Sequence, residues 1–202
     1  MIKLNYIERE GELMGTILIN FLGSPASGKS TLATKLFSRL KELGLDAEFV
    51  SEFVKGWAYA GKKIGKFDQF YILGKEVYNQ SKLFGKVNLV IADSPVALTA
   101  FYQLYYHGDN SLNGVCKRFY EMTNEEGVKV VNFFLPRRKK YNPKGRFQTA
   151  EEIAKLEQDL MNWLDLEGYE YEVLDCPDSK RIDRIIEKLK EVTDLTMVEE
   201  DE

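Results

Sequence analysis

The sequence predicts one α/β domain of three layers, in which a five-stranded parallel sheet carries helices on both faces. Short apolar runs alternate with longer segments of helical periodicity along almost the whole chain. Several of these runs are nearly continuous in apolar residues, as is typical of parallel strands buried on both faces. At 202 residues and 44% hydrophobic content, the chain is long enough for one well-buried domain and short for two. We therefore expect residues 1–202 to form a single domain.

The strands and helices follow in regular order. Strands are expected over 16–21, 46–51, 87–92, 129–135 and 169–174, because these runs are rich in apolar and β-branched residues. Helices are expected over 29–41, 67–84, 95–107, 113–125, 149–166 and 179–192. In the second of these, Phe70, Leu73, Val77 and Leu83 recur at helical spacing. Each strand–helix–strand unit joins parallel strands by a crossover.

The two ends of the chain are expected to be peripheral. Residues 1–13 precede the first core strand and are predicted to form either an added edge strand or a loose arm. The segment 197–202 is acidic and is expected to be disordered.

Composition and charge limit the partners and the cellular location that we expect for the chain. The net charge of −4 gives no whole-protein electrostatic reason for binding nucleic acid. Cys116 and Cys176 show no metal-ligand spacing, and no leader segment is recognised, so we expect reduced thiols and a cytoplasmic location. No apolar run approaches the roughly 20 residues of a membrane span, and no membrane partner is expected. Whether the chain forms a homodimer is left open.

The most informative motif follows the first core strand. It has the spacing of a phosphate-binding loop, with a glycine at its first position, a second before a lysine, and a closing serine. Its glycines allow backbone N–H groups to turn toward a polyanion, and the helix that follows adds its positive end. A glycine-rich turn before an ordinary helix is the alternative. The residues predicted to bind nucleotide are Gly23, Ser24, Pro25, Ala26, Ser27, Gly28, Lys29, Ser30 and Thr31, with Lys29 on the β- and γ-phosphates and Ser30 on Mg²⁺.

A second candidate is Asp93, which follows a buried apolar strand. An acid at this position can hold Mg²⁺ through water, opposite the phosphate loop. The alternative is an aspartate that only opens the turn Asp93-Ser94-Pro95. Because Ser94-Pro95 excludes the Asp-x-x-Gly switch of GTPases at this position, and no Asn-Lys-x-Asp segment occurs in the sequence, ATP is the expected nucleotide.

Glu52 ends the second strand, at the sheet edge where open α/β sheets bind ligands. A carboxylate there can orient an acceptor hydroxyl and take its proton during phosphoryl transfer. It can equally be an exposed glutamate that begins a helix. Gln69 could recognise a base edge with its amide, although a surface glutamine is the simpler expectation.

The segment 136–148 holds six basic residues, broken by prolines and a glycine, between the fourth strand and the next helix. We predict a closing lid whose arginines neutralise charge on the transferring phosphoryl group and exclude water. Basic residues interleaved with Tyr141 and Phe147 would also suit a nucleic-acid backbone and an unstacked base. A solvated basic loop is the alternative. The candidate lid arginines are Arg137, Arg138 and Arg146.

The chain resembles the P-loop kinases of the nucleoside and nucleotide kinase group, and more closely phage-type small ATPases near the nicotinamide riboside kinases. The resemblance is carried by the phosphate loop with Thr31 after it, and by segments 50–52, 68–74, 93–95 and 141–149. It implies the three-layer P-loop fold with sheet order 2-3-1-4-5, ATP and Mg²⁺ as cofactors, and adenine packing near residues 175–178. It also implies Glu52 as base and Asp93 as metal support. Asp93-Ser94 replaces the Asp-Arg pair of thymidylate kinases.

The acceptor remains open at the level of sequence. A P-loop kinase of this kind would phosphorylate a nucleoside, a nucleotide, or 5-hydroxymethyluracil within phage DNA, as a second resembling family of phage kinases does. The competing class is a nucleotide-dependent switch or regulatory ATPase that transfers phosphate to no substrate. Stoichiometric phosphate release without any acceptor would favour that class.

Overall fold

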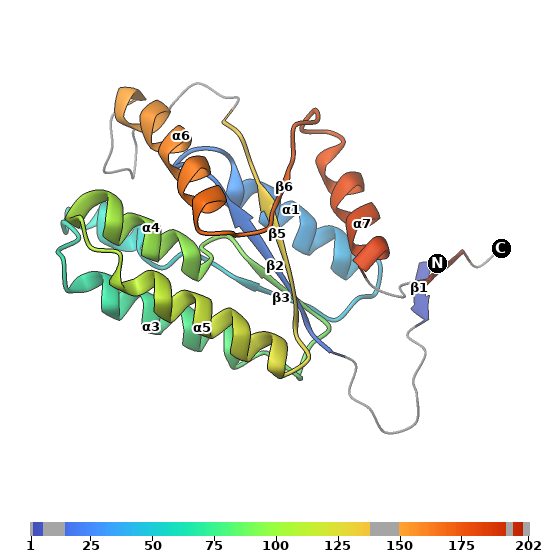
Figure 1. The fold of residues 1–202 in the computed structure, drawn as a ribbon. Coiled ribbons are helices and arrows are strands. Elements are labelled where there is room, and N and C mark those ends of the chain that lie inside the picture. Colours follow the sequence, from blue (N-terminus) through green and yellow to red (C-terminus); the bar gives the residue numbers. More distant parts are fainter. Residues whose placement is uncertain (1, 6–14, 138–149, 193–195, 200–202) are drawn as a thin grey trace.

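The computed structural model describes residues 2–5, 15–137, 150–192 and 196–199 (Figure 1). Its main sheet has five parallel strands in the order β3-β4-β2-β5-β6, which is the order 2-3-1-4-5 along the chain and confirms the expectation. Their bounds are β2 Ile17–Leu22, β3 Ala47–Val50, β4 Leu89–Ala92, β5 Lys129–Phe134 and β6 Glu172–Val173.

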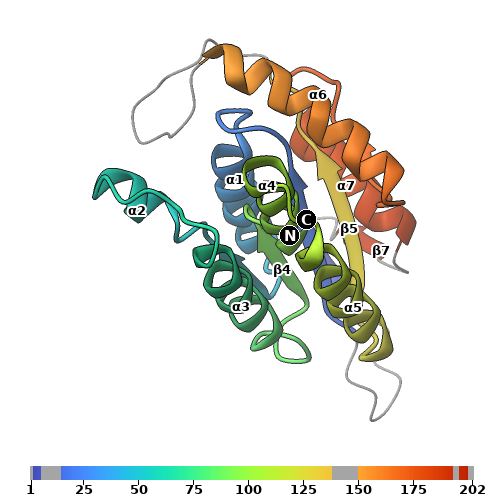
Figure 2. The ribbon, with the colours of Figure 1, turned by 60° about the vertical axis from the view of Figure 1, so that its left-hand side comes forward.

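Helices cover both faces of this sheet (Figure 2). The helices α1 and α7 pack on one face, whereas α3, α4, α5 and α6 pack on the other. Their bounds are α1 Lys29–Glu42, α3 Asp68–Ser81, α4 Val96–His107, α5 Ser111–Glu125, α6 Ala150–Leu166 and α7 Arg181–Val192. None of the helices in these described ranges is both long and apolar enough to cross a membrane.

The central strand β2 shows why the domain has two cores. All six of its residues are buried. Because side chains alternate along a strand, Ile17, Ile19 and Phe21 face the core under α1 and α7, while Leu18 and Leu22 face the core under the other four helices. β2 therefore lies fixed between two layers, and its carboxyl end holds the phosphate loop.

Three regions differ from the sequence prediction. A short helix, α2 (Lys55–Tyr59), was not predicted, and it stands at one side of the molecule in Figure 2. The last sheet strand is two residues long rather than six, because only Phe133 and Phe134 of β5 pair with it. In α3 the buried face is Gln69, Ile72, Leu73, Glu76 and Gln80, so Phe70 is exposed.

The chain ends form a separate two-stranded sheet, in which β1 (Ile2–Asn5) pairs antiparallel with β7 (Thr196–Glu199). β1 is therefore not an edge strand of the main sheet. Residues 197–199, expected to be disordered, lie in β7, because each of these two end segments supplies the other's backbone hydrogen-bond partners.

Candidate active site

The phosphate loop connects β2 to α1 in the conformation that its glycines allow. Gly23 and Gly28 have φ values of 143° and 102°, and Ala26 has a φ of 64°. A Cβ at position 23 would lie 2.7 Å from the Leu135 carbonyl oxygen and 2.9 Å from Ser27 Oγ, so only glycine fits there. The N-cap of α1 is Gly28, which has no side chain to bond the first N–H groups of the helix. The positive φ values let the loop backbone turn sharply, and the first N–H groups of α1 have no side-chain cap. Both features are typical of an anion-binding loop.

Lys29 folds back over this loop. Its Nζ donates to the carbonyl oxygens of Gly23 and Ser24, at 2.7 and 3.0 Å. These two bonds hold the ammonium group against the first two residues of the loop.

Glu157 of α6 also contacts the phosphate loop, an interaction that the sequence did not reveal. Ser24 Oγ donates to one Glu157 oxygen at 2.5 Å, and the backbone N–H of Arg137 lies 3.2 Å from both. The carboxylate of Glu157 therefore connects the phosphate loop to the point where the chain leaves the sheet after β5.

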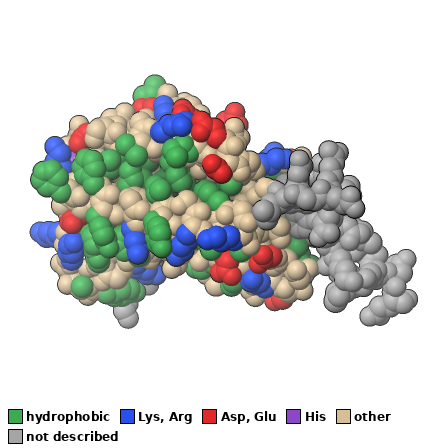
Figure 3. Space-filling model, turned by 90° about the horizontal axis from the view of Figure 1, so that it is seen from below, with side chains coloured by type: hydrophobic (Ala, Val, Ile, Leu, Met, Phe, Trp, Pro, Cys, Tyr) green, Lys and Arg blue, Asp and Glu red, His purple; other side chains and the backbone are tan. Residues whose placement is uncertain are grey.

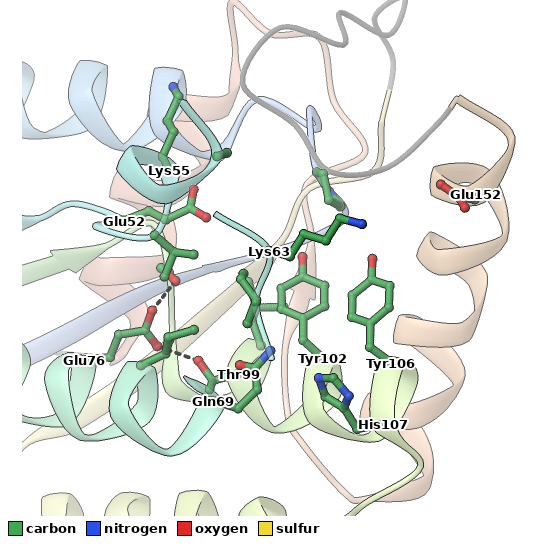
Figure 4. Close-up of a pocket in the computed structure, with 17 residues that line it drawn as sticks. Glu52, Lys55, Lys63, Gln69, Glu76, Thr99, Tyr102, Tyr106, His107 and Glu152 are labelled. Atoms are coloured by element: carbon green, nitrogen blue, oxygen red, sulfur yellow. Dashed lines mark hydrogen bonds between the residues drawn. The ribbon is translucent and has the colours of Figure 1, made fainter. Parts of the chain in front are cut away.

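Asp93 and Glu52 meet at the carboxyl ends of β4 and β3. Asp93 is 3% exposed, and its Oδ1 accepts a 2.7 Å hydrogen bond from the backbone N–H of Glu52. Two predicted site residues, 41 positions apart in sequence, are thus brought into direct contact. The contact also orients the chain at Glu52, whose side chain turns toward the cavity described next (Figure 4).

A cavity of about 340 Å³ lies beside the phosphate loop, and we call it the α3–α4 cavity. Pro25 of the loop reaches it, and Glu52 and Glu152 border it from opposite sides (Figure 4). Its other polar and aromatic lining comes from five segments of the chain, namely Lys55, Lys63, Gln69, Glu76, Ser94, Thr99, Tyr102, Tyr106 and His107. This volume lies within the range of small-molecule sites.

Gln69 corrects the simpler sequence expectation. It is 3% exposed and lines the α3–α4 cavity, so it is not a surface glutamine. Its position on the buried face of α3 explains why, because Ile72, Leu73 and Glu76 share that face. A buried amide can both donate and accept hydrogen bonds.

Glu76 is the second polar residue on this buried face, and its only sign in the sequence is a charge at an apolar helix position. Its two carboxyl oxygens bond the hydroxyls of Ser94 and Thr99, at 2.5 and 2.8 Å. Burial raises the pKa of Glu76 to about 8, and the nearby charges of Glu52 and Asp93 act in the same direction. The group is therefore mainly a neutral acid at pH 7, and it ties α3 to the segment that follows Asp93.

A second, smaller cleft also borders the phosphate loop, and it is lined by loop and α1 residues together with Asp178 and Arg181. Arg181 is buried, and its Nη1 lies 3.2 Å from Asp178 Oδ1. Its Nε and Nη2 are buried with no hydrogen-bond partner among the described residues. The structure thus brings the end of the segment 175–178, where adenine was expected, next to the loop.

Of the predicted lid, only its first residues, through Arg137, are described. Arg138 and Arg146, like the rest of 138–149, lie outside the described residues.

The donor set fits a hard metal ion held jointly with phosphate. Within the described ranges, no group of three or more His, Cys, Asp or Glu side chains is placed to hold a metal ion by itself. Mg²⁺ is commonly bound by one or two protein oxygens together with substrate phosphates. Ser30, in the first turn of α1, and Asp93, directly after β4, are oxygen donors of this kind.

The sheet order and the loop between β2 and α1 define a three-layer P-loop fold. A family model described as "AAA domain" matches residues 18–181, and the chain belongs to this family. A search of curated proteins finds no match.

Solved structures of similar fold include NadR in complex with NR, with a TM-score of 0.68 and 17% identity over 93% of this chain and 54% of NadR. NadR in complex with NAD and AMP-PNP gives the same TM-score at 16% identity, covering 93% and 52%. Deoxyadenosine kinase from M. mycoides, with the products dCMP and dCDP bound, gives 0.54 at 18% identity, covering 86% and 99%. The chain spans about half the length of the NadR chains. At these identities the likeness shows the fold.

Proposed function

We propose that this protein is an ATP-dependent kinase that transfers the γ-phosphoryl group to a hydroxyl of a nucleoside, a nucleotide or a hydroxymethylated base in DNA. The observation that carries the proposal is the α3–α4 cavity, which adjoins the phosphate loop at Pro25 and has Glu52 on its border. A switch or regulatory ATPase needs no second cavity of this size beside its nucleotide.

The nucleotide side of the site is the phosphate loop. In the proposal its backbone N–H groups and Lys29 bind the phosphates of ATP, and Thr31 follows at the start of α1. Adenine lies at the small cleft that Asp178 and Arg181 line beside the loop. Ser30, Asp93 and the phosphates would hold Mg²⁺, which would supply neutralisation of the charge on the phosphoryl oxygens.

The acceptor side is the α3–α4 cavity. Its aromatic lining, Tyr102 and Tyr106, suits the faces of a base or sugar, and the buried amide of Gln69 suits a base edge. The acceptor oxygen attacks the γ-phosphorus, the bond from that phosphorus to the β-phosphate oxygen breaks, and ADP leaves. Glu52 receives the proton of the acceptor hydroxyl.

In the proposal the lid residues complete the site. Arg137, Arg138 and Arg146 contribute positive charge around the moving phosphoryl group and help to exclude water. The anchoring of the Arg137 backbone on Glu157, which also binds Ser24, supports this placement for the first of them.

Labelled ATP tests the proposal. The protein is incubated with γ-labelled ATP, Mg²⁺ and a panel of nucleosides, nucleoside monophosphates and hydroxymethyluracil-containing DNA, and each product is separated. We expect label on one class of acceptor. Label that appears only in inorganic phosphate, at the same rate with every acceptor, would refute the kinase assignment.

A further inference from the structure

The elements that form one wall of the α3–α4 cavity carry a concentration of positive charge. Residues 53–86 contain seven lysines and only two acids, although the chain as a whole has a net charge of −4. One acid, Asp68, pairs with Lys62 at 3.1 Å, and the other, Glu76, is buried inside the domain. The outer side of this segment is therefore basic in an acidic protein.

The same segment carries exposed aromatic rings. Five of the six exposed aromatic side chains in the described part of the chain lie between residues 59 and 78, and their exposure runs from 50% for Phe70 to 82% for Phe67. The described protein has no other cluster of this kind, since most of its remaining exposed large apolar side chains are isolated aliphatic residues. Exposed rings in this number indicate a binding surface.

Lysine ammonium groups lie close to aromatic rings at two places in this segment. Lys62 Nζ lies 3.3 Å from the centre of the Trp57 ring, which stacks on Tyr71 at 6.0 Å and 9°. Farther along α3, Lys75 and Lys82 lie 5.8 and 5.4 Å from the ring of Tyr78. We call the exposed lysine and aromatic side chains of residues 55–82 the α2–α3 surface. Figure 3 views the molecule from below, where α3 lies, and hydrophobic and basic side chains stand side by side across that face.

We infer that the α2–α3 surface binds a single-stranded stretch of nucleic acid, and, resting on the proposed function, that the acceptor hydroxyl is carried on such a strand. Lysines at intervals match the phosphates of a polynucleotide, and exposed ring faces match unstacked bases. A duplex would satisfy only the lysines, because its bases already stack on one another. An acidic protein partner would match the lysines but not the five exposed rings.

The surface is also continuous with the cavity. Lys55 and Lys63 belong to the lysine-rich segment and line the α3–α4 cavity, as does Gln69 on the inner side of α3 (Figure 4). A strand lying along the outer face of α3 can therefore direct one base around this edge and into the cavity. Extruding that base is least costly when the strand is already unpaired.

Fluorescence anisotropy without ATP tests the strand-binding step alone. The probes are a labelled single-stranded oligonucleotide of about 16 nucleotides, the upper end of a typical site size, a duplex of the same sequence, and polyphosphate as competitor. We expect the single strand to bind more tightly than the duplex, and polyphosphate to compete weakly. Equal binding of all three polyanions, or no strand binding at low salt, overturns the inference.

Two double variants separate the contributions of rings and charges. F67A/Y78A should weaken strand binding about fivefold or more while keeping the salt dependence. K66A/K82A should lower the slope of log affinity against log salt by about 0.7 for each phosphate that no longer meets a lysine. The matched controls are L166A, an exposed apolar residue on α6, and K190A, an exposed lysine on α7, and both should bind as wild type. If F67A/Y78A binds strands normally but abolishes a self-association seen by sedimentation, the surface is an interface between copies and the inference is wrong.

Failure here is distinguishable from failure of the proposed function. Label transfer to free nucleosides with no strand binding would leave the kinase in place and remove the polymer acceptor. Specific strand binding with no label on any acceptor would leave the surface in place and reject the kinase.

Discussion

The phosphate loop and the α3–α4 cavity lie side by side but are built in different ways. The loop is one continuous segment, Gly23–Ser30, whose shape is set by its own glycines and by the helix that it starts. The cavity is assembled from the loop, the ends of β3 and β4, α2, α3, α4 and α6, and its key polar groups, Glu52, Gln69 and Glu76, are far apart in sequence from Thr99 and Tyr102. In the proposed function, nucleotide binding therefore depends on local sequence, whereas acceptor choice depends on how distant elements pack.

The largest effect is expected at the loop. Lys29→Ala should lower the rate of phosphoryl transfer at least about 100-fold, since it removes a charge placed on the phosphates, and it should weaken ATP binding measured by calorimetry. Lys41→Ala, at the exposed end of the same helix, should behave as wild type. Near-normal turnover in folded Lys29→Ala would contradict the assignment of the loop.

The next effect separates the two carboxylates that border the sites. Glu52→Gln should lower kcat about 100-fold or more, as expected for loss of a general base, with little change in ATP affinity. Asp93→Asn should instead raise the Mg²⁺ concentration needed for activity. Asn is the suitable substitution because it keeps an Oδ1 that can accept the bond from the Glu52 backbone.

Glu48→Gln, a partly exposed glutamate on the strand that leads to Glu52, serves as control and should leave both parameters unchanged. If Glu52→Gln and Asp93→Asn show one and the same defect, the division of labour between acceptor side and nucleotide side is wrong.

A smaller effect is expected where the loop is held by α6. Glu157→Ala removes the acceptor of both Ser24 Oγ and the Arg137 backbone N–H. We expect the KM for ATP to rise about 10-fold, the equivalent of one to two hydrogen bonds, with kcat less affected. Glu151→Gln, an exposed residue in the first turn of α6, is the control. An unchanged KM would show that the loop keeps its shape without this contact.

The last prediction concerns stability rather than turnover. Because the pKa of Glu76 is about 8 in the folded protein against 4.5 for an ordinary glutamate, the folded state binds a proton that the unfolded state releases over this range. The contribution of Glu76 to stability is therefore complete below pH 4.5 and is lost as pH rises toward 8, by up to about 1.4 kcal/mol per pH unit. Chemical denaturation of wild type and Glu76→Gln at several pH values measures this. Parallel profiles would contradict a buried neutral acid.

The phosphate loop and the α3–α4 cavity also differ in how well the sequence predicted them. The sheet order, the buried strands and the phosphate loop were predictable because periodicity and a contiguous motif encode them. The burial of Gln69 and Glu76 was not predicted, because the apolar pattern of Phe70, Leu73 and Val77 indicated a face of α3 displaced from the buried one, and Phe70 is in fact exposed. Polar residues at positions 69, 76 and 80, spaced as a helix face among Ile72 and Leu73, were the signal that could have revealed it.

Other features depend on tertiary contacts with no local pattern. The bond from Ser24 to Glu157 joins residues 133 positions apart, and α2 is a single short helix that contains Gly56, too short for its periodicity to be recognised. β6 lies in a longer run that resembles a strand, yet only Glu172 and Val173 of that run pair with the neighbouring strand, β5. For the bond from Ser24 to Glu157 and for β6, the partner rather than the segment determines the structure.

The most direct test of the central claim, that ATP and an acceptor occupy adjacent but separately built sites, is the fate of the γ-phosphoryl group. With γ-labelled ATP and the best acceptor of the panel, wild type should place nearly all label on the acceptor and little in inorganic phosphate. Glu52→Gln should slow that transfer while binding ATP normally. If wild type releases label as inorganic phosphate at the same rate with or without any acceptor, the α3–α4 cavity is not an acceptor site and the account is wrong.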